Sequence, residues 1–221
     1  MTAQIVADDD SGRTAAIAVL RAGGVVALPT DTVYGIAVAI DTPGGIERLF
    51  QVKRRPPDKS IALLIADAEQ AATMGVVTDA AEALAAACWP GGLTLVLTRR
   101  PGVVLPDVLT GGAATVGVRV PDHAAPRALA DAVGPLPTTS ANVSGQPEAR
   151  DAAEIVALLG DAIDLVLDGG PAHGGPASTV IDASGDSLRV IRVGAIPVGR
   201  LTAVLEAARL PHALEAPVQP E

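Results

Sequence analysis

The segment Lys53–Lys59 (Lys-Arg-Arg-Pro-Pro-Asp-Lys) concentrates positive charge in a chain that is acidic overall. It contains four of the 16 lysine and arginine residues, including both lysines of the chain. Lysine is a compact point charge and arginine a planar fork, so two lysines kept close together indicate a site of defined geometry. The chemistry that such a cluster favours is the binding of an anion such as phosphate. The same composition also fits a solvated turn after a helix, with the charges idle at the surface.

Further polar segments punctuate the apolar runs of the chain. They are Pro29–Gly35, Thr115–Arg119, Pro137–Ser144, Ser178–Thr179 and Arg192. Hydroxyls, amides and cations dominate them, whereas histidines and carboxylates are nearly missing. A site of this kind positions anions but offers no obvious general base, which suits the attack of a ready-made nucleophile on a phosphoryl group. Each segment alone also fits ordinary turn chemistry.

Several common motifs are absent from the sequence. It has no P-loop (Gly-x-x-x-x-Gly-Lys-Ser/Thr), no Gly-x-Gly-x-x-Gly fingerprint and no Gly-x-Ser-x-Gly nucleophile elbow. The three histidines, His123, His173 and His212, are too far apart for metal-ligand spacing. The glycine-rich segment 169–175 is compatible with wrapping a phosphate and equally with a plain mobile loop.

Bulk composition excludes other classes. The formal charge of −9 and the pI near 4.7 argue against broad, non-specific binding to nucleic acid or to anionic membrane. With Tyr34, Phe50 and Trp89 as the only aromatic residues, a base-stacking platform is not expected, and the core must be aliphatic. Cys88 stands alone in an alanine-rich run, which fits a reducing compartment. The acidic N-terminus and the lack of a long apolar run predict a soluble, cytoplasmic protein.

Apolar periodicity and chain breakers place elements along the whole sequence. Helices are predicted at 13–22 (capped by Ser11), 44–52, 68–74, 78–88, 125–133, 151–159 and 197–209. Strands are predicted at 25–28, 61–65, 93–97, 115–120, 163–167, 179–183 and 188–193, with an apolar run at 36–40 and a polar loop at 137–144. The mixture predicts one α/β (α+β) domain, residues 1–210, with a twisted, mostly mixed sheet flanked by helices. The proline-rich tail, residues 211–221, is predicted to be flexible.

The polar segments belong to longer stretches with a recognisable order. These are Leu28–Gly35, Lys53–Pro56, Trp89–Thr94, Val116–Pro121, Pro137–Asn142 with Ser144–Gly145, Ser178–Asp182 and Ile191–Gly194. Together they resemble the threonylcarbamoyl-AMP synthase (YrdC-type) family in its short single-domain form. The agreement runs from about Gly12 to Leu205 and so covers nearly the whole chain. One such motif is modest evidence, whereas seven in order make the resemblance specific.

The resemblance implies a YrdC-like fold and a reaction. L-threonine, bicarbonate and ATP, with Mg²⁺ accompanying the ATP, would give threonylcarbamoyl-AMP and pyrophosphate. The threonine amine would capture bicarbonate as a carbamate, whose oxygen attacks the α-phosphate. The product would pass to a downstream tRNA threonylcarbamoyl-transferase complex for threonylcarbamoyladenosine modification of tRNA. Contact with tRNA itself would be weak or indirect.

The resemblance also implies roles for individual residues. Lys53 and Arg55 would be catalytic, acting on the triphosphate and the carbamate. Residues expected to bind threonine are Thr32, Tyr34, Arg119, Thr139 and Ser178. Residues expected to bind the nucleotide are Lys53, Arg55, Lys59, Thr115, Ser140, Ala141, Asn142, Ser144 and Arg192. Arg54 would face solvent, and no residue is assigned as a dedicated metal ligand.

Two departures and two alternatives accompany this interpretation. Leu64 stands where some archaeal members carry a histidine, and a chain ending at Glu221 has no room for the extra C-terminal domain of the longer family form.

One alternative is an RNA-binding or ribosome-assembly module of the same fold, which the acidic net charge disfavours. The other is a carbamoyl-adenylate transfer domain like that of hydrogenase-maturation carbamoyltransferases, which is normally embedded in a much longer chain.

Overall fold

The computed structural model describes residues 3–56, 59–172, 174–210 and 214–215, and within these ranges it has one sheet and eight helices. The strands are β1 (Gln4–Ala7), β2 (Val26–Leu28), β3 (Gly35–Ala37), β4 (Ala62–Leu64), β5 (Gly75–Val76), β6 (Leu93–Arg99), β7 (Thr115–Arg119), β8 (Leu136–Ser140), β9 (Leu165–Asp168), β10 (Thr179–Asp182), β11 (Leu188–Arg192) and β12 (Leu214–Glu215). The helices are α1 (Asp10–Arg21), α2 (Gly45–Lys53), α3 (Ala68–Met74), α4 (Asp79–Cys88), α5 (Asp107–Thr110), α6 (Ala124–Val133), α7 (Ala152–Leu159) and α8 (Val198–Ala207).

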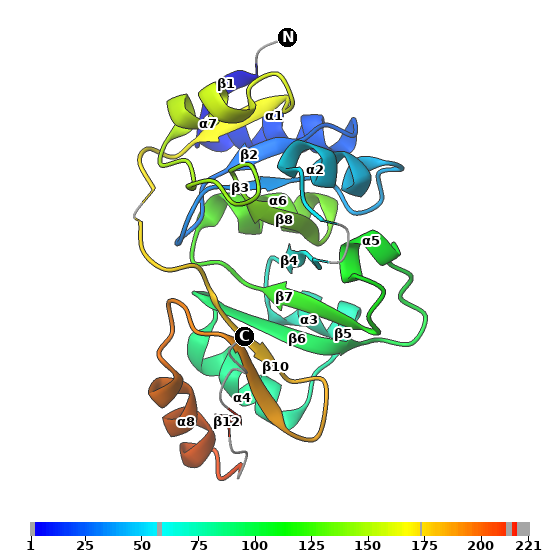
Figure 1. Ribbon diagram of the computed structural model, residues 1–221, viewed down its shortest axis with the longest axis vertical. Coiled ribbons are helices and arrows are strands. Elements are labelled where there is room, and N and C mark those ends of the chain that lie inside the picture. The colour runs from blue at the N-terminus through cyan, green and yellow to red at the C-terminus, as the bar shows by residue number, and fades with distance from the viewer. Residues whose placement is uncertain (1–2, 57–58, 173, 211–213, 216–221) are drawn as a thin grey trace.

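The sheet is mixed, and its strands follow the order β1-β9-β2-β3-β8-β4-β7-β6-β10-β11-β12, with β5 attached to β6. Parallel pairs such as β1/β9, β4/β7 and β6/β10 alternate with antiparallel pairs such as β2/β3, β3/β8 and β6/β7. The long axis of the molecule runs across the strands, from β1 at one end to β11 and α8 at the other (Figure 1). The predicted mixed sheet flanked by helices is confirmed.

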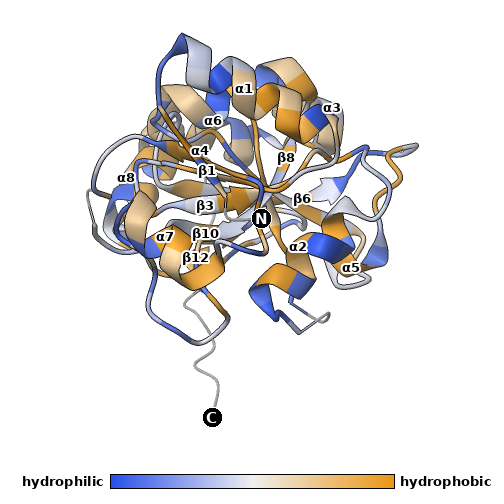
Figure 2. Cartoon of the chain, turned by 90° about the horizontal axis from the view of Figure 1, so that it is seen from above, coloured by the Kyte–Doolittle hydropathy of each residue, from blue (hydrophilic) through white to orange (hydrophobic). Residues whose placement is uncertain are grey.

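Strand β9 explains how helices come to cover both faces of the sheet. Its alternate residues Leu165 and Leu167 pack with Leu20 of α1, while Val166 belongs to the cluster that contains Ile155 of α7. Because successive side chains of a strand point to opposite faces, this run fixes α1 and α7 on opposite sides. Figure 2 shows α1, α3 and α6 on one side, and α2, α5 and α7 on the other.

The start of α1 differs from the prediction, which placed the cap at Ser11. Asp9 is the N-cap, and its Oδ1 accepts a hydrogen bond from the Gly12 amide at 2.8 Å. Ser11 therefore lies inside the helix. Gly12 is required there, because a Cβ at this position would lie 1.9 Å from the carbonyl oxygen of Ala7 at the end of β1.

The polar loop predicted at 137–144 is wrong in its first half, because residues 136–140 form β8. This strand lies between β3 and β4 near the middle of the sheet and pairs antiparallel with both. Pro137 has no amide hydrogen to donate, but its carbonyl accepts from Val38 N at 3.3 Å. The hydroxyl residues and the proline hide the strand from periodicity arguments, since both are ordinarily depleted from central strands.

Helix α2 ends at a left-handed residue, ahead of the Pro56-Pro57 pair. Arg54 adopts the left-handed conformation (φ 50°), and the Arg55 amide donates to the Phe50 carbonyl at 3.0 Å. This closes the last turn before Pro56 is reached, whereas Pro57 lies outside the described residues. The turn sends Arg55 and the residues after it away from the helix axis.

The remaining differences concern short elements and the tail. The sequence prediction missed β1, β5, α5 and β12, and placed a longer run where β3 is. The predicted flexible tail, residues 211–221, lies outside the described residues except for β12, which pairs with β11. In the described part of the chain, no helix is long and apolar enough to span a membrane.

We expect Leu167→Ala to lower the free energy of unfolding by about 2–5 kcal/mol. Leu167 is fully buried beneath α1, so truncation leaves a cavity in the middle of a packed layer. Ile5→Ala is the matched control, because Ile5 lies on the edge strand β1 and is 49% exposed. Urea denaturation followed by circular dichroism measures both changes. Equal losses in the two variants would contradict this account of the core.

Candidate active site

A cavity of about 590 Å³ lies on one face of the central strands. Most of the strand residues in its lining alternate along their strands, as expected from the two-residue period of a strand. The alternating residues are Ala62 and Leu64 of β4, Thr94 and Val96 of β6, Thr115, Gly117 and Arg119 of β7, Thr138 and Ser140 of β8, and Val180 and Asp182 of β10, and Val116 and Thr139 join them. The floor of the cavity is therefore sheet surface that carries hydroxyls and charges.

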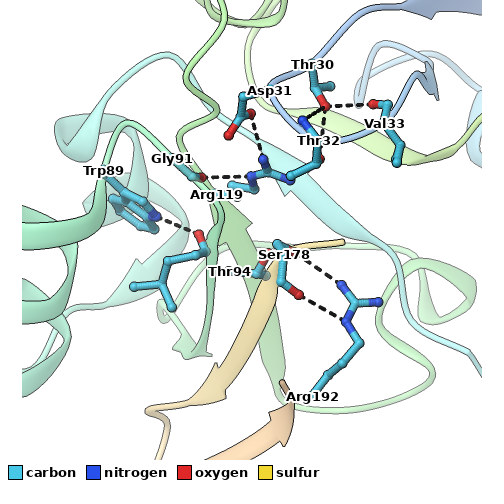
Figure 3. Close-up of polar contacts among 11 residues, drawn as sticks. Thr30, Asp31, Thr32, Val33, Trp89, Gly91, Thr94, Arg119, Ser178 and Arg192 are labelled. Carbon is cyan, nitrogen blue, oxygen red and sulfur yellow. Dashed lines mark hydrogen bonds and ion pairs between the residues drawn. The ribbon is translucent and has the colours of Figure 1, made fainter. Parts of the chain in front are cut away.

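Arg119, at the end of β7, is held by three partners from two separate turns (Figure 3). Its Nε donates to the Gly91 carbonyl at 2.9 Å, its Nη1 to Thr32 Oγ1 at 3.1 Å, and its Nη2 to Asp31 Oδ1 at 2.6 Å. The side chain is only 7% exposed. Burial lowers the pKa of Arg119 from its ordinary value, and the Asp31 carboxylate opposes that shift. The guanidinium thus stays charged and is aimed by fixed partners.

The turn that supplies these partners is stabilised from within. Thr30 Oγ1 accepts from the Thr32 amide at 3.1 Å and donates to the Val33 carbonyl at 2.6 Å. Tyr34 follows and is almost fully buried, so desolvation raises the pKa of its phenol. Its hydroxyl donates to the Gly170 carbonyl at 2.6 Å and accepts from the Gly169 amide at 3.0 Å. Tyr34 is in the cavity lining, but its hydroxyl is committed to the glycine-rich segment.

The opposite wall contains a second guanidinium, that of Arg192 on β11, an exposed residue whose head group is only partly removed from water. It donates from Nε to the Ser178 carbonyl at 3.0 Å and from Nη2 to Ser178 Oγ at 3.2 Å (Figure 3). Ser178 Oγ also shares a 2.8 Å hydrogen bond with Thr94 Oγ1. Burial lowers the pKa of Arg192, and the charge of Arg119 lowers it further. Two like charges that face one cavity favour an anionic occupant.

Lys53 is buried at the C-terminus of α2, where it is 3% exposed, and it is not in the lining of the cavity. Its Nζ donates to the Ser140 carbonyl at 2.7 Å, to Ser140 Oγ at 2.8 Å, and to Asn142 Oδ1. Burial lowers the pKa of Lys53 to about 8, and the nearby Arg55 charge adds to the effect. In this arrangement Lys53 fastens α2 to the turn that follows β8.

Arg55 lies in the cavity lining. Its side chain also helps to hold the loop that follows, residues 59–60. Its Nε donates to the Lys59 carbonyl at 2.9 Å and its Nη2 to the Ser60 carbonyl at 2.7 Å. Lys59 itself is exposed and is not in the lining. Of the two predicted catalytic residues, the structure brings Arg55 to the cavity and places the Lys53 ammonium against the 140–142 turn.

The cavity assembles most of the residues that the sequence selected. Thr32, Tyr34, Arg55, Thr115, Arg119, Thr139, Ser140, Ser178 and Arg192 line it. Lys53, Lys59, Ala141, Asn142 and Ser144 are not in the lining, and Ala141 and Ser144 use their amides to bind the carbonyls of Tyr34 and Lys53.

Sequence reasoning gave no role to Asp31, to the Gly91 carbonyl, to Thr94 or to Glu148. Glu148 is in the cavity lining, and Asp31 and the Gly91 carbonyl hold Arg119. A signal existed for Thr94, which is the one hydroxyl in the otherwise apolar run Leu93–Leu97. The role of the Gly91 carbonyl could not be predicted, because every residue type has the same backbone carbonyl.

Comparison with known proteins identifies the family of the chain. The family model Sua5_yciO_yrdC, described as "Telomere recombination", matches residues 18–194. The chain belongs to this family. It is 35% identical over 93% of its length to a protein of Bacillus subtilis named threonylcarbamoyl-AMP synthase. It is also 35% identical over 88% of its length to a putative threonylcarbamoyl-AMP synthase of Mycobacterium leprae.

Members of the family with solved structures share the fold. The structure of Pyrococcus abyssi Sua5 complexed with L-threonine superposes with a TM-score of 0.84 and 31% identity over 97% of this chain. Escherichia coli YciO superposes with a TM-score of 0.78 and 28% identity over 89% of this chain. This chain spans 61% of the B. subtilis relative and 62% of the Sua5 chain, but 88% of the M. leprae relative and 96% of YciO.

We expect Lys53 to titrate near pH 8, well below the ordinary lysine value of about 10.4. Desolvation disfavours the charged form of Lys53, so it loses its proton at lower pH. With ¹³C-labelled lysine the protein gives only two lysine Cε signals, and Lys59→Arg assigns them. A Lys53 signal that titrates above pH 10 would show that its ammonium is not desolvated.

Proposed function

We propose that this protein is an L-threonylcarbamoyladenylate synthase. The observation that carries the proposal is the cavity itself, in which Arg55, Arg119 and Arg192 face threonine and serine hydroxyls. Histidine is missing from the lining among the described residues. The names of relatives such as the B. subtilis protein support the same assignment.

Arg119 is proposed to bind the threonine carboxylate. Three of its five N–H groups are used by Gly91, Thr32 and Asp31, which leaves one on each terminal nitrogen. A carboxylate that takes this pair forms a bidentate, charge-assisted contact. The complex of P. abyssi Sua5 with L-threonine supports threonine as the substrate. Thr32, Tyr34, Thr139 and Ser178 are proposed to complete this side of the pocket.

The reaction then needs alignment more than proton transfer. The threonine amine and bicarbonate form a carbamate and release water, and a carbamate oxygen attacks the α-phosphorus of ATP. The bond between that phosphorus and the oxygen bridging to the β-phosphate breaks, and pyrophosphate leaves with the electron pair. The carbamate is already an anionic nucleophile, so a cavity that is rich in cations and poor in bases is sufficient. Arg55 and Arg192 are proposed to neutralise the charge on the phosphates.

The nucleotide is proposed to lie along Thr115, Ser140 and Arg192, next to Arg55. Lys59, Ala141, Asn142 and Ser144 belong to the same proposal, as segments next to the lining. Lys53 is proposed to act on this side as well. In the described geometry the ammonium of Lys53 binds Ser140, so its proposed contribution is to hold the Ser140–Asn142 turn in position. Direct contact with a phosphate would require Nζ to leave that turn.

Mg²⁺ is proposed to accompany the ATP, where it neutralises phosphate charge. The described residues contain no group of three or more His, Cys, Asp or Glu side chains able to hold a metal ion alone. This donor set fits magnesium that is carried mainly by the phosphates. Cytoplasmic location, delivery of the product to a tRNA threonylcarbamoyl-transferase complex and the absence of a strong direct tRNA contact complete the proposal.

Purified protein should release pyrophosphate from ATP only when L-threonine and bicarbonate are both present. We expect Arg55→Ala to lower kcat/KM by about 10²–10³, because a charge next to the reacting phosphates is lost. Arg54→Gly is the matched control: Arg54 is exposed, is not in the cavity lining and has a φ of 50° that glycine accepts. Coupled pyrophosphate detection measures both variants. Turnover with carbamoyl phosphate in place of threonine and bicarbonate would instead favour a carbamoyl-transfer domain.

We expect Arg119→Lys to raise the KM for threonine by about 10- to 100-fold and to change the KM for ATP little. A lysine keeps the charge but cannot form the bidentate contact or serve three anchoring partners at once. Steady-state kinetics with each substrate varied in turn measures the split. A larger effect on ATP than on threonine would move the carboxylate site away from Arg119.

A further inference from the structure

We propose that Glu148 supplies an oxygen ligand to the Mg²⁺ that enters with ATP. This inference rests on the proposed function, because it takes the nucleotide to occupy the cavity. Glu148 is in the cavity lining, on the segment between β8 and α7. Neither composition nor motif singles this residue out.

The segment that carries Glu148 is pinned on both sides of it. On one side, Asn142 Nδ2 donates to the Gln146 carbonyl at 2.5 Å. On the other, the buried Ala149 donates its amide to the Ala141 carbonyl at 3.4 Å. The Glu148 backbone is therefore fixed above the turn that Lys53 and Ser140 hold, while its side chain remains exposed to the cavity.

Glu148 lies within electrostatic range of two cations, the buried Lys53 and the cavity residue Arg192. Its charge acts on Lys53 of α2 and on Arg192 of β11, and it favours the protonated form of both. Glu148 shares the cavity lining with Arg55 and Arg192, the residues proposed to neutralise the phosphates, so a polyphosphate held by them would pass near its carboxylate. Alone it would repel the phosphates, so a divalent cation between carboxylate and phosphates turns an unfavourable contact into a favourable one.

The other nearby carboxylates already have partners. Asp31 is ion-paired with Arg119 at 2.6 Å. Asp182 accepts from Ser184 N and Oγ and forms an ion pair with Arg189 at 2.9 Å. Glu148 forms no ion pair within 4 Å among the described residues. Magnesium in nucleotide sites usually takes one or two carboxylates together with the phosphates, and Glu148 is the carboxylate of this lining that is ready for that role.

The test is the affinity for ATP, measured by calorimetry on the full chain without threonine, once in EDTA and once in excess Mg²⁺. In EDTA, Glu148→Gln should bind ATP about threefold more tightly than the unchanged protein, because a repulsive charge is gone. In Mg²⁺ it should bind about fivefold more weakly, because a metal ligand is gone. The sign of the effect should thus reverse with the metal. Glu47→Gln is the control, since Glu47 is exposed on the first turn of α2 and is not in the cavity lining.

Tighter binding in both conditions would overturn the inference, since Glu148 would then only oppose the phosphates. Equal binding in both conditions would also overturn it. Electron paramagnetic resonance of Mn²⁺ with the protein–ATP complex gives a second readout, in which the Mn²⁺ affinity should fall about fivefold in Glu148→Gln and not in Glu47→Gln. If the unchanged protein binds no ATP in either condition, the proposed function fails together with this inference. If the unchanged protein binds ATP but the effect of Glu148→Gln does not change sign with Mg²⁺, only this inference fails and the proposed function stands.

Discussion

The buried guanidinium of Arg119 is the interaction on which the site depends. A charge removed from water is tolerated only when it is paired and hydrogen-bonded, and here the partners come from two turns far apart in the sequence. Asp31 and Thr32 lie before β3, and Gly91 lies before β6. The need to satisfy one cation therefore brings both turns to the end of β7, and the cavity wall is the result.

The sequence predicted those parts of the structure that depend on local pattern. Apolar runs located most of the strands, and residues 115–120 were predicted both as a strand and as part of a polar segment of the site. Prediction from local pattern failed at β8, because Pro137 and the hydroxyl residues after it are not typical of a central strand. Such a strand is held in place by its two neighbours, a constraint that a single segment does not reveal.

The direction of individual side chains was also beyond local pattern. The left-handed turn at Arg54 sends Lys53 and Arg55 to different surroundings, although they are two positions apart. A charge cluster in the sequence is thus divided by the fold into a buried anchor and a cavity residue. The chain has a net charge of −9, yet arginines gather at this one cavity. Salt screens the distant acidic surface at physiological ionic strength, so the nearby cations govern what an anion experiences there.

The hydroxyl of Tyr34 has an effect well beyond its own turn. By binding both Gly169 and Gly170, it ties the Thr30–Tyr34 turn to the crossover that runs from β9 to β10 and ends at Ser178. The two walls that carry Arg119 and Arg192 are thereby connected through the main chain as well as across the sheet. Replacing Tyr34 by phenylalanine would remove one donor and one acceptor at once, and the two glycine backbone groups would lose the partner that joins this segment to the turn.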